Sequence, residues 1–388
     1  MSRRYFLGMP FDFDTAVDRA GTWSTRWERH AGKDIIPLWV ADTDFRAAPA
    51  ILEAISARVQ HGVFGYSTPP HELRGAIVRR MQQRYGWRID PSWIVFIPGV
   101  VPGLHLAARH LVPADGHAII PRPVYHHFRK AMELAPRAFG EAPLVLESGR
   151  WVFDTDVLKK SINPKTKAFF LCNPQNPGGT VFRRAELERL AEITRDLLIV
   201  SDEIHCDLVL DPELRHVPIA SLAPEISRRT LTLMSANKTF NIPASGLGWA
   251  IIEDAALRGK FSGEVAAHVL GSPSVFGMAA TLAALERCDD WLAALLAYLR
   301  GNRDLVEKEI GLPMAHVEAT YLAWIDCSSV PDAAGLFLKN GVAVYDGTQF
   351  GDGRFIRLNF GTQRKILGEA LRRISASPTT ASRPSPRG

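Results

Sequence analysis

The chain has 388 residues, of which 46% are hydrophobic and 22% charged, a composition typical of globular domains that excludes a disordered, fibrous or membrane-embedded protein. At roughly 100–200 residues per domain, this length predicts two or three domains. The net charge of +5 is spread over short pairs such as Arg79-Arg80, so no basic cluster indicates a nucleic-acid partner.

The N-terminal segment contains a pair of arginines, Arg3-Arg4, that is similar to a twin-arginine export motif. Asp12, Asp14 and Asp18 follow at once and interrupt the apolar stretch that a signal peptide needs. No apolar run approaches the roughly 18 residues of a membrane helix, so we expect no membrane partner. The four cysteines show no CxxC spacing and the histidines no HExxH spacing, which disfavours disulfides and a metal site. We expect a cytoplasmic protein.

Short apolar strands alternate with amphipathic helices along the middle of the chain. The helix expected over Arg183–Asp196, for example, has apolar residues at helical spacing. Nearly continuous apolar strands between helices predict an α/β fold, with a mostly parallel sheet covered on both faces. The strands expected are Trp93–Ile97, Ala118–Ile120, Ala168–Leu171, Leu197–Val200, Leu231–Met234 and Gly248–Ile252.

Four of these strands are followed by segments whose residues could bind a ligand. In such sheets, ligands bind outside the carboxyl ends of the strands. Pro98–Gly103 enters a helix whose N-terminus suits a phosphate, although a plain strand–turn–helix junction explains it as well. Cys172–Thr180 is a Pro- and Gly-rich loop that either holds Asn176 for a ligand or is only a structural turn. Asp202 and Lys238 follow two further strands, either as a structural salt bridge or as parts of a site.

One cofactor, pyridoxal 5'-phosphate (PLP), requires all of these groups together: a lysine, a carboxylate for the pyridinium nitrogen and a phosphate cradle. Tyr125 follows a further strand and could cover the ring. In this order and spacing, the motifs resemble the fold-type I PLP enzymes of the class I/II aminotransferase family, over about residues 30 to 374. The resemblance implies a PLP-dependent transferase-like fold with a smaller α+β domain built from both chain ends.

The resemblance also implies roles for the residues that contact the ring. Lys238 would bind PLP covalently and later act as the base at the substrate α-carbon, and Asp202 would keep the pyridine nitrogen protonated. Asn176 would hydrogen-bond the phenolic oxygen of the cofactor, Tyr125 would stack on the ring and serve catalysis, and His205 would belong to the cofactor site.

The phosphate and the substrate have their own expected ligands. The backbone at Val100 and Val101 together with Ser235 would bind the phosphate. Tyr66 would reach the phosphate of a partner subunit, which implies a homodimer. For an amino-acid substrate, Arg357 would clamp the α-carboxylate, with Arg354 as the nearby alternative. Ala41 and Asn176 complete the expected substrate site.

Two segments are similar to the cystathionine β-lyase-like branch of carbon–sulfur lyases: Trp39–Phe45 to its W-V-A-D-M-D-F and Asp202–Asp207 to its D-E-I-H-x-D. We therefore expect α,β-elimination from an S-substituted cysteine such as cystathionine, giving a thiol, pyruvate and ammonia. Gln175, Asn237 and Gly246 depart from the branch pattern. They keep open an aminotransferase, or another pathway-specific PLP enzyme of amino-acid or natural-product biosynthesis. A regulatory binding protein on the same fold is a third possibility.

The same resemblance divides the chain into domains. We expect a large PLP-binding domain over residues 49–285 and a small domain from residues 1–48 and 286–374. Residues 375–388 are rich in Ser, Thr, Ala, Pro and Arg, which predicts a disordered tail.

Overall fold

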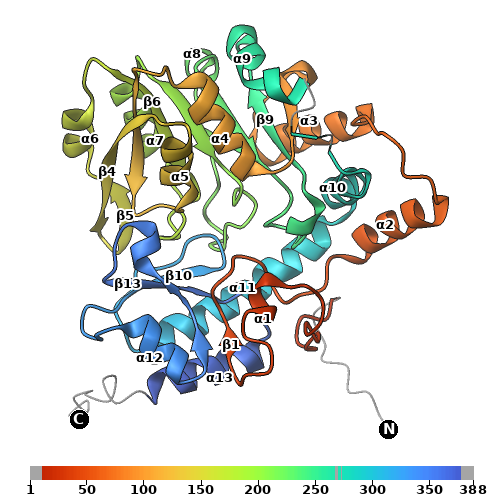
Figure 1. Cartoon of the computed structure of the whole chain (residues 1–388), viewed down its shortest axis with the longest axis vertical. Helices are drawn as coiled ribbons and strands as arrows, with labels where there is room; N and C mark the ends of the chain where they lie inside the picture. The colour runs from red at the N-terminus through yellow and green to blue at the C-terminus, as the bar shows by residue number, and fades with distance from the viewer. Residues whose placement is uncertain (1–10, 267–269, 272, 377–388) are drawn as a thin grey trace.

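A computed structural model describes residues 11–266, 270–271 and 273–376. Its centre is an eight-stranded sheet with the strand order β2-β9-β8-β7-β6-β3-β4-β5 (Figure 1). The pairs β3–β4, β3–β6, β6–β7 and β7–β8 are parallel, whereas β9 and β5 run antiparallel to their neighbours. The expected α/β fold with a mostly parallel sheet is confirmed. The strands are β2 (Ile94–Ile97), β3 (His117–Arg122), β4 (Ala138–Glu147), β5 (Arg150–Phe153), β6 (Thr166–Cys172), β7 (Leu198–Asp202), β8 (Thr230–Met234) and β9 (Gly248–Ile252).

Helices cover both faces of this sheet because the side chains of its central strands alternate between two apolar cores. On β6, Phe170 belongs to the core under α4 (Val100–Leu111), α5 (His127–Leu134) and α9 (Ala255–Ala266). Its neighbours Phe169 and Leu171 belong to the opposite core, under α6 (Thr155–Ser161) and α7 (Arg184–Ile193). Both faces are therefore shielded from water, which explains why the central strands are mostly apolar.

A helical layer lies beside the β2 edge of the sheet. It contains α3 (His71–Tyr85) and α10 (Val275–Arg287), which share an apolar core with β2 and β9. α2 (Pro49–His61) packs along α10 and forms the projecting right-hand side of the molecule in Figure 1. The short helices η1 (Pro91–Trp93), η2 (Ile219–Ser221), α8 (Pro224–Ser227) and η3 (Pro243–Ser245) complete this part.

The two ends of the described chain meet below the large sheet, red beside blue in Figure 1. β1 (Ile36–Pro37) pairs in parallel with β11 (Val342–Ala343), and β13 is the centre of a three-stranded sheet with the order β10-β13-β12. One core joins the N-terminal residues Leu38 and Phe45 to the C-terminal helices. The remaining elements are α1 (Thr25–Glu28), α11 (Asp289–Glu309), β10 (Leu322–Asp326), α12 (Ala333–Lys339), β12 (Tyr345–Asp346), η4 (Gly347–Phe350), β13 (Phe355–Asn359) and α13 (Arg364–Ser375).

Three sequence expectations bear on the ends and the covalent state of the chain. The tail was expected from residue 375, but helix α13 continues through Ser375, and residues 377–388 lie outside the described residues. All four cysteines are buried and free. Within the described ranges, no helix combines the length and the apolar character needed to cross a membrane.

Candidate active site

A cavity of about 270 Å³ opens at the carboxyl ends of β6 and β7, between the large sheet and the chain ends. Its wall collects most of the residues expected from the sequence: Ala41, Val100, Val101, Tyr125, Asn176, Asp202, His205, Lys238 and Arg357. These residues come from segments more than 300 positions apart in the sequence. The sheet and the chain ends therefore bring them together only in the folded molecule.

Strand register explains why the polar groups meet. Cys172 is level with Asp202, and Asp202 is level with Leu233, so β6, β7 and β8 end at nearly the same height. Asp202 is the last residue of β7, while Asn176 and Lys238 stand on the loops that follow β6 and β8. In a parallel sheet, such loops all leave from the same edge.

Asp202 and Lys238 are charged groups in a poorly hydrated place. Burial raises the pKa of Asp202 to about 7, although a hydrogen bond from Ile204 N (3.1 Å) and the charge of Lys238 oppose that rise. Burial, and after it the charge of Arg357, lowers the pKa of Lys238 to about 8. His205 is buried beside them, and burial holds its pKa well below the ordinary value, so its ring is neutral.

Arg357 is a buried cation with a free hydrogen-bond donor, and it could bind an anion. Its side chain is 1% exposed and lies against the rings of Tyr345 and Phe350, with Cζ 5.0 and 4.6 Å from their centres. Nη1 donates to Asn176 Oδ1 (2.9 Å) and Nη2 to Trp39 O (3.1 Å), while the buried Nε has no hydrogen-bond partner. Burial lowers the pKa of Arg357 to about 10, which still leaves it charged at neutral pH. A carboxylate is the natural partner for such a group.

The first turn of α4 forms another side of the cavity. Gly99, with φ of +128°, turns the chain from β2 into this helix, and the backbone N–H groups of its first turn have no partners within the helix. Gly248 on the adjacent strand makes room for the turn, because a Cβ there would lie 3.2 Å from Gly99 Cα. A helix N-terminus next to a cavity suits a phosphate group.

Three residues that the sequence suggested for the site do not line the cavity. Ser235 is buried behind the wall, where its hydroxyl donates to Leu247 O (2.7 Å) and accepts from Asn237 N (3.1 Å). Tyr66 is fully exposed, on the segment between α2 and α3, and does not reach the cavity of its own chain. Arg354 is exposed and pairs with Asp352, so the geometry favours Arg357 over Arg354 as the substrate clamp.

The departures from the branch pattern have local explanations. Gln175 is fully buried and donates to Pro123 O (2.7 Å), so it ties the loop after β6 to the loop that carries Tyr125. Asn237 lines the cavity and accepts a hydrogen bond from Ser245 Oγ (2.8 Å). Gly246 adopts φ of +62° after η3, a left-handed conformation that favours glycine.

Sequence reasoning missed two aromatic residues near the site. Tyr345 lines the cavity and covers Arg357, and the hydroxyl of Tyr321 donates to Ala41 O (3.0 Å). Both lie in the C-terminal part, outside the strand–helix pattern that identified the other residues. The apolar run around Tyr321 predicts a strand, but nothing local indicates what its side chain contacts.

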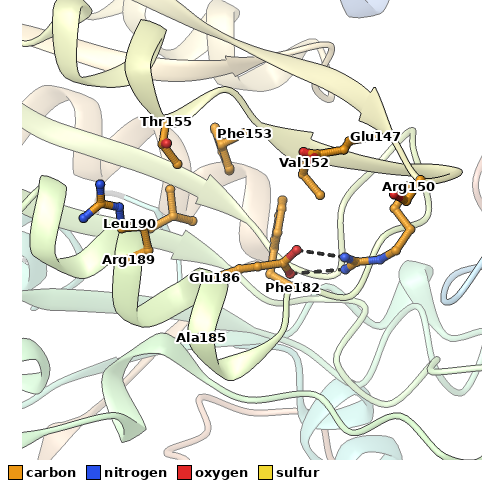
Figure 2. Close-up of a pocket in the computed structure, with 11 residues that line it drawn as sticks. Glu147, Arg150, Val152, Phe153, Thr155, Phe182, Ala185, Glu186, Arg189 and Leu190 are labelled. Atoms are coloured by element: carbon orange, nitrogen blue, oxygen red, sulfur yellow. Dashed lines mark hydrogen bonds and ion pairs between the residues drawn. The ribbon is translucent and has the colours of Figure 1, made fainter.

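A larger cavity of about 500 Å³ lies between β5 and α7, but the arginine side chains that line it already form salt bridges. Figure 2 shows Arg150 turned toward Glu186, with which it forms a salt bridge of 2.8 Å. Arg150 also pairs with Glu318 (2.7 Å), and Arg189 pairs with Glu192 (2.8 Å). Paired charges at the surface make a poor ligand site, so the smaller cavity is the candidate active site.

Comparison with known proteins agrees with this geometry. Residues 33–374 match the family model for aminotransferase class I and II. The chain belongs to this family. Among its curated relatives, cystathionine beta-lyase PatB of Bacillus subtilis is 34% identical to this chain, over 94% of this chain and 99% of PatB. Protein MalY of Escherichia coli is 33% identical, over 93% of this chain and 97% of MalY.

Solved structures resemble this aminotransferase-family chain along nearly its whole length. The crystal structure of OvoB has a TM-score of 0.92 at 43% identity and covers 96% of this chain and 100% of OvoB. Cystalysin from Treponema denticola, which contains a PLP cofactor, has a TM-score of 0.90 at 29% identity, over 95% of this chain and 99% of cystalysin.

The cavity residues fit PLP on physical grounds. The raised pKa of Asp202 marks a buried carboxylate that lacks a full cationic partner, and a protonated pyridine nitrogen would be one. Lys238 carries the amine, Tyr125 an aromatic face, and the first turn of α4 the phosphate cradle. Among the described residues, no group of three or more His, Cys, Asp or Glu side chains is arranged to hold a metal ion.

Proposed function

We propose that this protein is a PLP-dependent carbon–sulfur β-lyase that acts on cystathionine or another S-substituted cysteine. The observation that carries the proposal is the cavity in which Lys238, Asp202 and Arg357 converge, in a chain that aligns end to end with relatives named cystathionine beta-lyase. The presence of all three groups in one cavity favours an enzyme over a binding protein on the same fold.

Each side chain has a defined task in this proposal. Arg357 and Asn176 hold the substrate carboxylate and the edge of the cofactor, and Asp202 pairs with the pyridinium nitrogen. Tyr125 stacks on the ring and His205 lies beside it as a neutral group. Val100 and Val101 present backbone N–H groups to the phosphate, and Ser235 orders the neighbouring loop.

Lys238 moves the proton. When bound, PLP supplies an electron sink for the carbanion that forms at the substrate α-carbon. Lys238 takes the α-proton, the Cβ–S bond breaks, and the electron pair leaves with sulfur as a thiolate. The unsaturated amine that remains hydrolyses to pyruvate and ammonia, so the reaction needs no oxidant, reductant or acceptor.

The decisive experiment is incubation of the purified protein with cystathionine or cystine in the absence of any keto acid. We expect pyruvate to appear together with the sulfur product, a thiol from cystathionine or a persulfide from cystine, and the Lys238→Ala variant to produce neither. If no pyruvate forms, and the substrate is converted to its S-substituted 2-keto acid only after a keto-acid acceptor is added, the result would contradict the lyase and establish an aminotransferase. That alternative has support in a relative named as a probable N-succinyldiaminopimelate aminotransferase, of Mycobacterium tuberculosis and 28% identical.

We further propose a homodimer in the cytoplasm. Tyr66 is fully exposed, and α2 and the segment after it carry further exposed apolar side chains: Leu52, Val59, Val63 and Phe64. Such a patch suits a second copy of the chain, whose cofactor phosphate Tyr66 would then reach. The free, buried cysteines agree with a reducing compartment.

A further inference from the structure

A strap of backbone, residues 37–45, crosses the cavity opposite the sheet and is held along its whole length. Every carbonyl oxygen from Pro37 to Phe45 accepts a hydrogen bond, and most of the donors are side chains. The side chains that hold the strap are Arg19, Arg26, Lys238, Asn241, Tyr321, Arg357, Asn359 and Gln363. The position of each of these carbonyls is therefore defined by a specific donor.

Ala41 is the member of the strap that faces the reacting lysine. Its carbonyl oxygen accepts from Lys238 Nζ at 2.6 Å and from the Tyr321 hydroxyl at 3.0 Å, which occupies both lone pairs. The carbonyls on either side, of Val40 and Asp42, are both held by Asn359 Nδ2. Ala41 O is thus fixed by its neighbours and directed by Tyr321.

Tyr321 is held in place by a strained residue. Thr320 is fully buried and has φ of +77°, which is unusual for a β-branched side chain. Its N–H donates to Leu208 O (2.9 Å), and its hydroxyl accepts from Leu322 N (3.1 Å). The turn aims the Tyr321 ring edge-on at His205, with centroids 6.1 Å apart, and its hydroxyl at Ala41. Burial raises the pKa of Tyr321 far above its ordinary value, so the hydroxyl remains a donor.

We propose that Tyr321 is a positioning residue that holds the Ala41 carbonyl as the acceptor for the protonated amine of Lys238. In the reaction, a proton passes from the substrate α-carbon to Lys238 Nζ, the electron pair stays on the substrate, and the new ammonium finds Ala41 O in hydrogen-bond range. This second part rests on the proposed lyase function. The hydrogen bond between Lys238 and Ala41 exists in the chain alone and does not depend on it.

The first test measures the amine of Lys238 in the full-length protein after the cofactor has been removed. Its pKa is read from the pH dependence of labelling by acetic anhydride, quantified by mass spectrometry of the Lys238 peptide. In Tyr321→Phe, the Ala41 carbonyl loses the donor that directs it and can turn away from the ammonium. We expect the pKa of Lys238 to fall by about 0.5 units. An unchanged or higher value would overturn the proposal. Arg357, Asp42 and Asp202 also act on this amine and are unaltered.

Tyr298→Phe is the matched control. Tyr298 is also fully buried, and its hydroxyl donates to Asp14 Oδ1 (2.5 Å) and accepts from Arg364 N (2.8 Å), with no contact to the strap carbonyls. The control should lose stability on the same scale and leave the pKa of Lys238 unchanged. If Tyr321→Phe fails to fold, Asn359→Ala takes its place. It removes one hydrogen bond from each of the carbonyls on either side of Ala41 and should lower the same pKa.

The second test concerns the reaction and uses the holoenzyme with α-deuterated substrate. We expect Tyr321→Phe to reduce kcat about tenfold, to change KM by less than about twofold, and to increase the deuterium isotope effect, because proton transfer becomes slower. A loss of kcat with no rise in the isotope effect would overturn the role in proton transfer. If the wild-type protein eliminates nothing, the proposed function fails, and the labelling test still decides whether Tyr321 positions Lys238.

Discussion

Lys238 carries an amine whose charge state depends on two opposing influences in the cavity. Burial and the charge of Arg357 lower its pKa to about 8, whereas Asp42 and Asp202 act in the opposite direction. Only the neutral amine can attack the aldehyde of PLP. Below pH 8, the rate constant of cofactor capture by the apoprotein should therefore rise by up to about tenfold per pH unit, and it should level off above that pH. Stopped-flow absorbance at several pH values measures this profile.

Arg357→Gln tests the cause of the shift. The substitution removes the positive charge that disfavours the ammonium, so the pKa of Lys238 should rise and the capture profile should move to higher pH. A profile that stays in place would show that the charge of Arg357 does not lower the pKa of Lys238.

The guanidinium of Arg357 supports a second prediction at this scale. Its planar fork can hold both oxygens of a carboxylate, and the single ammonium of lysine cannot. Arg357→Lys should reduce kcat/KM for an amino-acid substrate about 30-fold, equivalent to about 2 kcal/mol. Arg354→Lys is the matched control, because Arg354 is exposed and pairs with Asp352 outside the cavity. Equal losses in the two variants would contradict the assignment of Arg357 as the clamp.

Among the elements, the buried strands were predictable and the half-exposed ones were not. β6, β7 and β8 are mostly apolar, because both of their faces are covered, and each was expected within two residues of its observed bounds. The hairpin of β4 and β5 was missed. The apolar residues of β4 are interrupted by Gly140, Glu141 and Pro143, and its last three residues are exposed, so its pairing depends on β3 rather than on its own pattern.

The site residues also divide into those that the sequence could predict and those that it could not. Asn176, Asp202 and Lys238 could be predicted because each directly follows a recognisable strand, and the edge of a parallel sheet brings such positions together. Tyr321 and Tyr345 could not. The contact of Tyr321 with Ala41 joins segments about 280 residues apart, and that of Tyr345 with Arg357 depends on the pairing of β12 with β13. The departure at Gln175 suggested a change near the substrate, but the structure shows a link between two loops.

Glu318 joins elements of both parts of the molecule, which yields a prediction about stability. It is 3% exposed, accepts from Val181 N (2.8 Å), and pairs with Arg150 and Arg183 at 2.7 Å each. Glu318→Gln should reduce the free energy of unfolding by about 2–3 kcal/mol, because two cations lose the carboxylate that neutralises them. Urea denaturation measures the loss.

The control for this prediction is Glu188→Gln. Glu188 forms an exposed pair with Arg184 on α7, and the expected loss is below about 0.5 kcal/mol. If both variants lose the same small amount, the Glu318 cluster contributes little to stability and does not tie the elements together.

On the scale of the whole molecule, the site depends on contacts between distant parts of the chain. The strap at residues 37–45 comes from the N-terminal part and Lys238 from the loop after β8, while Tyr321 directly precedes β10 and Arg357 lies on β13. The domain division at residues 49–285 stays a prediction. In either case, the strap is hydrogen-bonded to both Asn241 and Asn359, so movement of the chain ends against the sheet would change the surroundings of Lys238.

The proposed dimer extends this dependence to a second chain and can be tested by mixing two inactive variants. Tyr66→Ala should weaken cofactor binding, and Lys238→Ala should abolish activity. In a hybrid dimer of the two, one site carries both defects. The other site combines the intact Lys238 of one subunit with the intact Tyr66 of its partner. Refolding an equal mixture should therefore restore about a quarter of the wild-type activity, because half of the dimers are hybrids and each hybrid has one working site.

A Tyr66 that served its own chain would give a different result. Each site of the hybrid would then carry one defect, and mixing would restore nothing. Activity must be measured at a PLP concentration that saturates the wild type and leaves Tyr66→Ala largely empty. Each variant refolded alone gives the baseline. Recovery above that baseline requires that Tyr66 cross the interface, and its exposed position beside the apolar side chains of α2 is the reason to expect this.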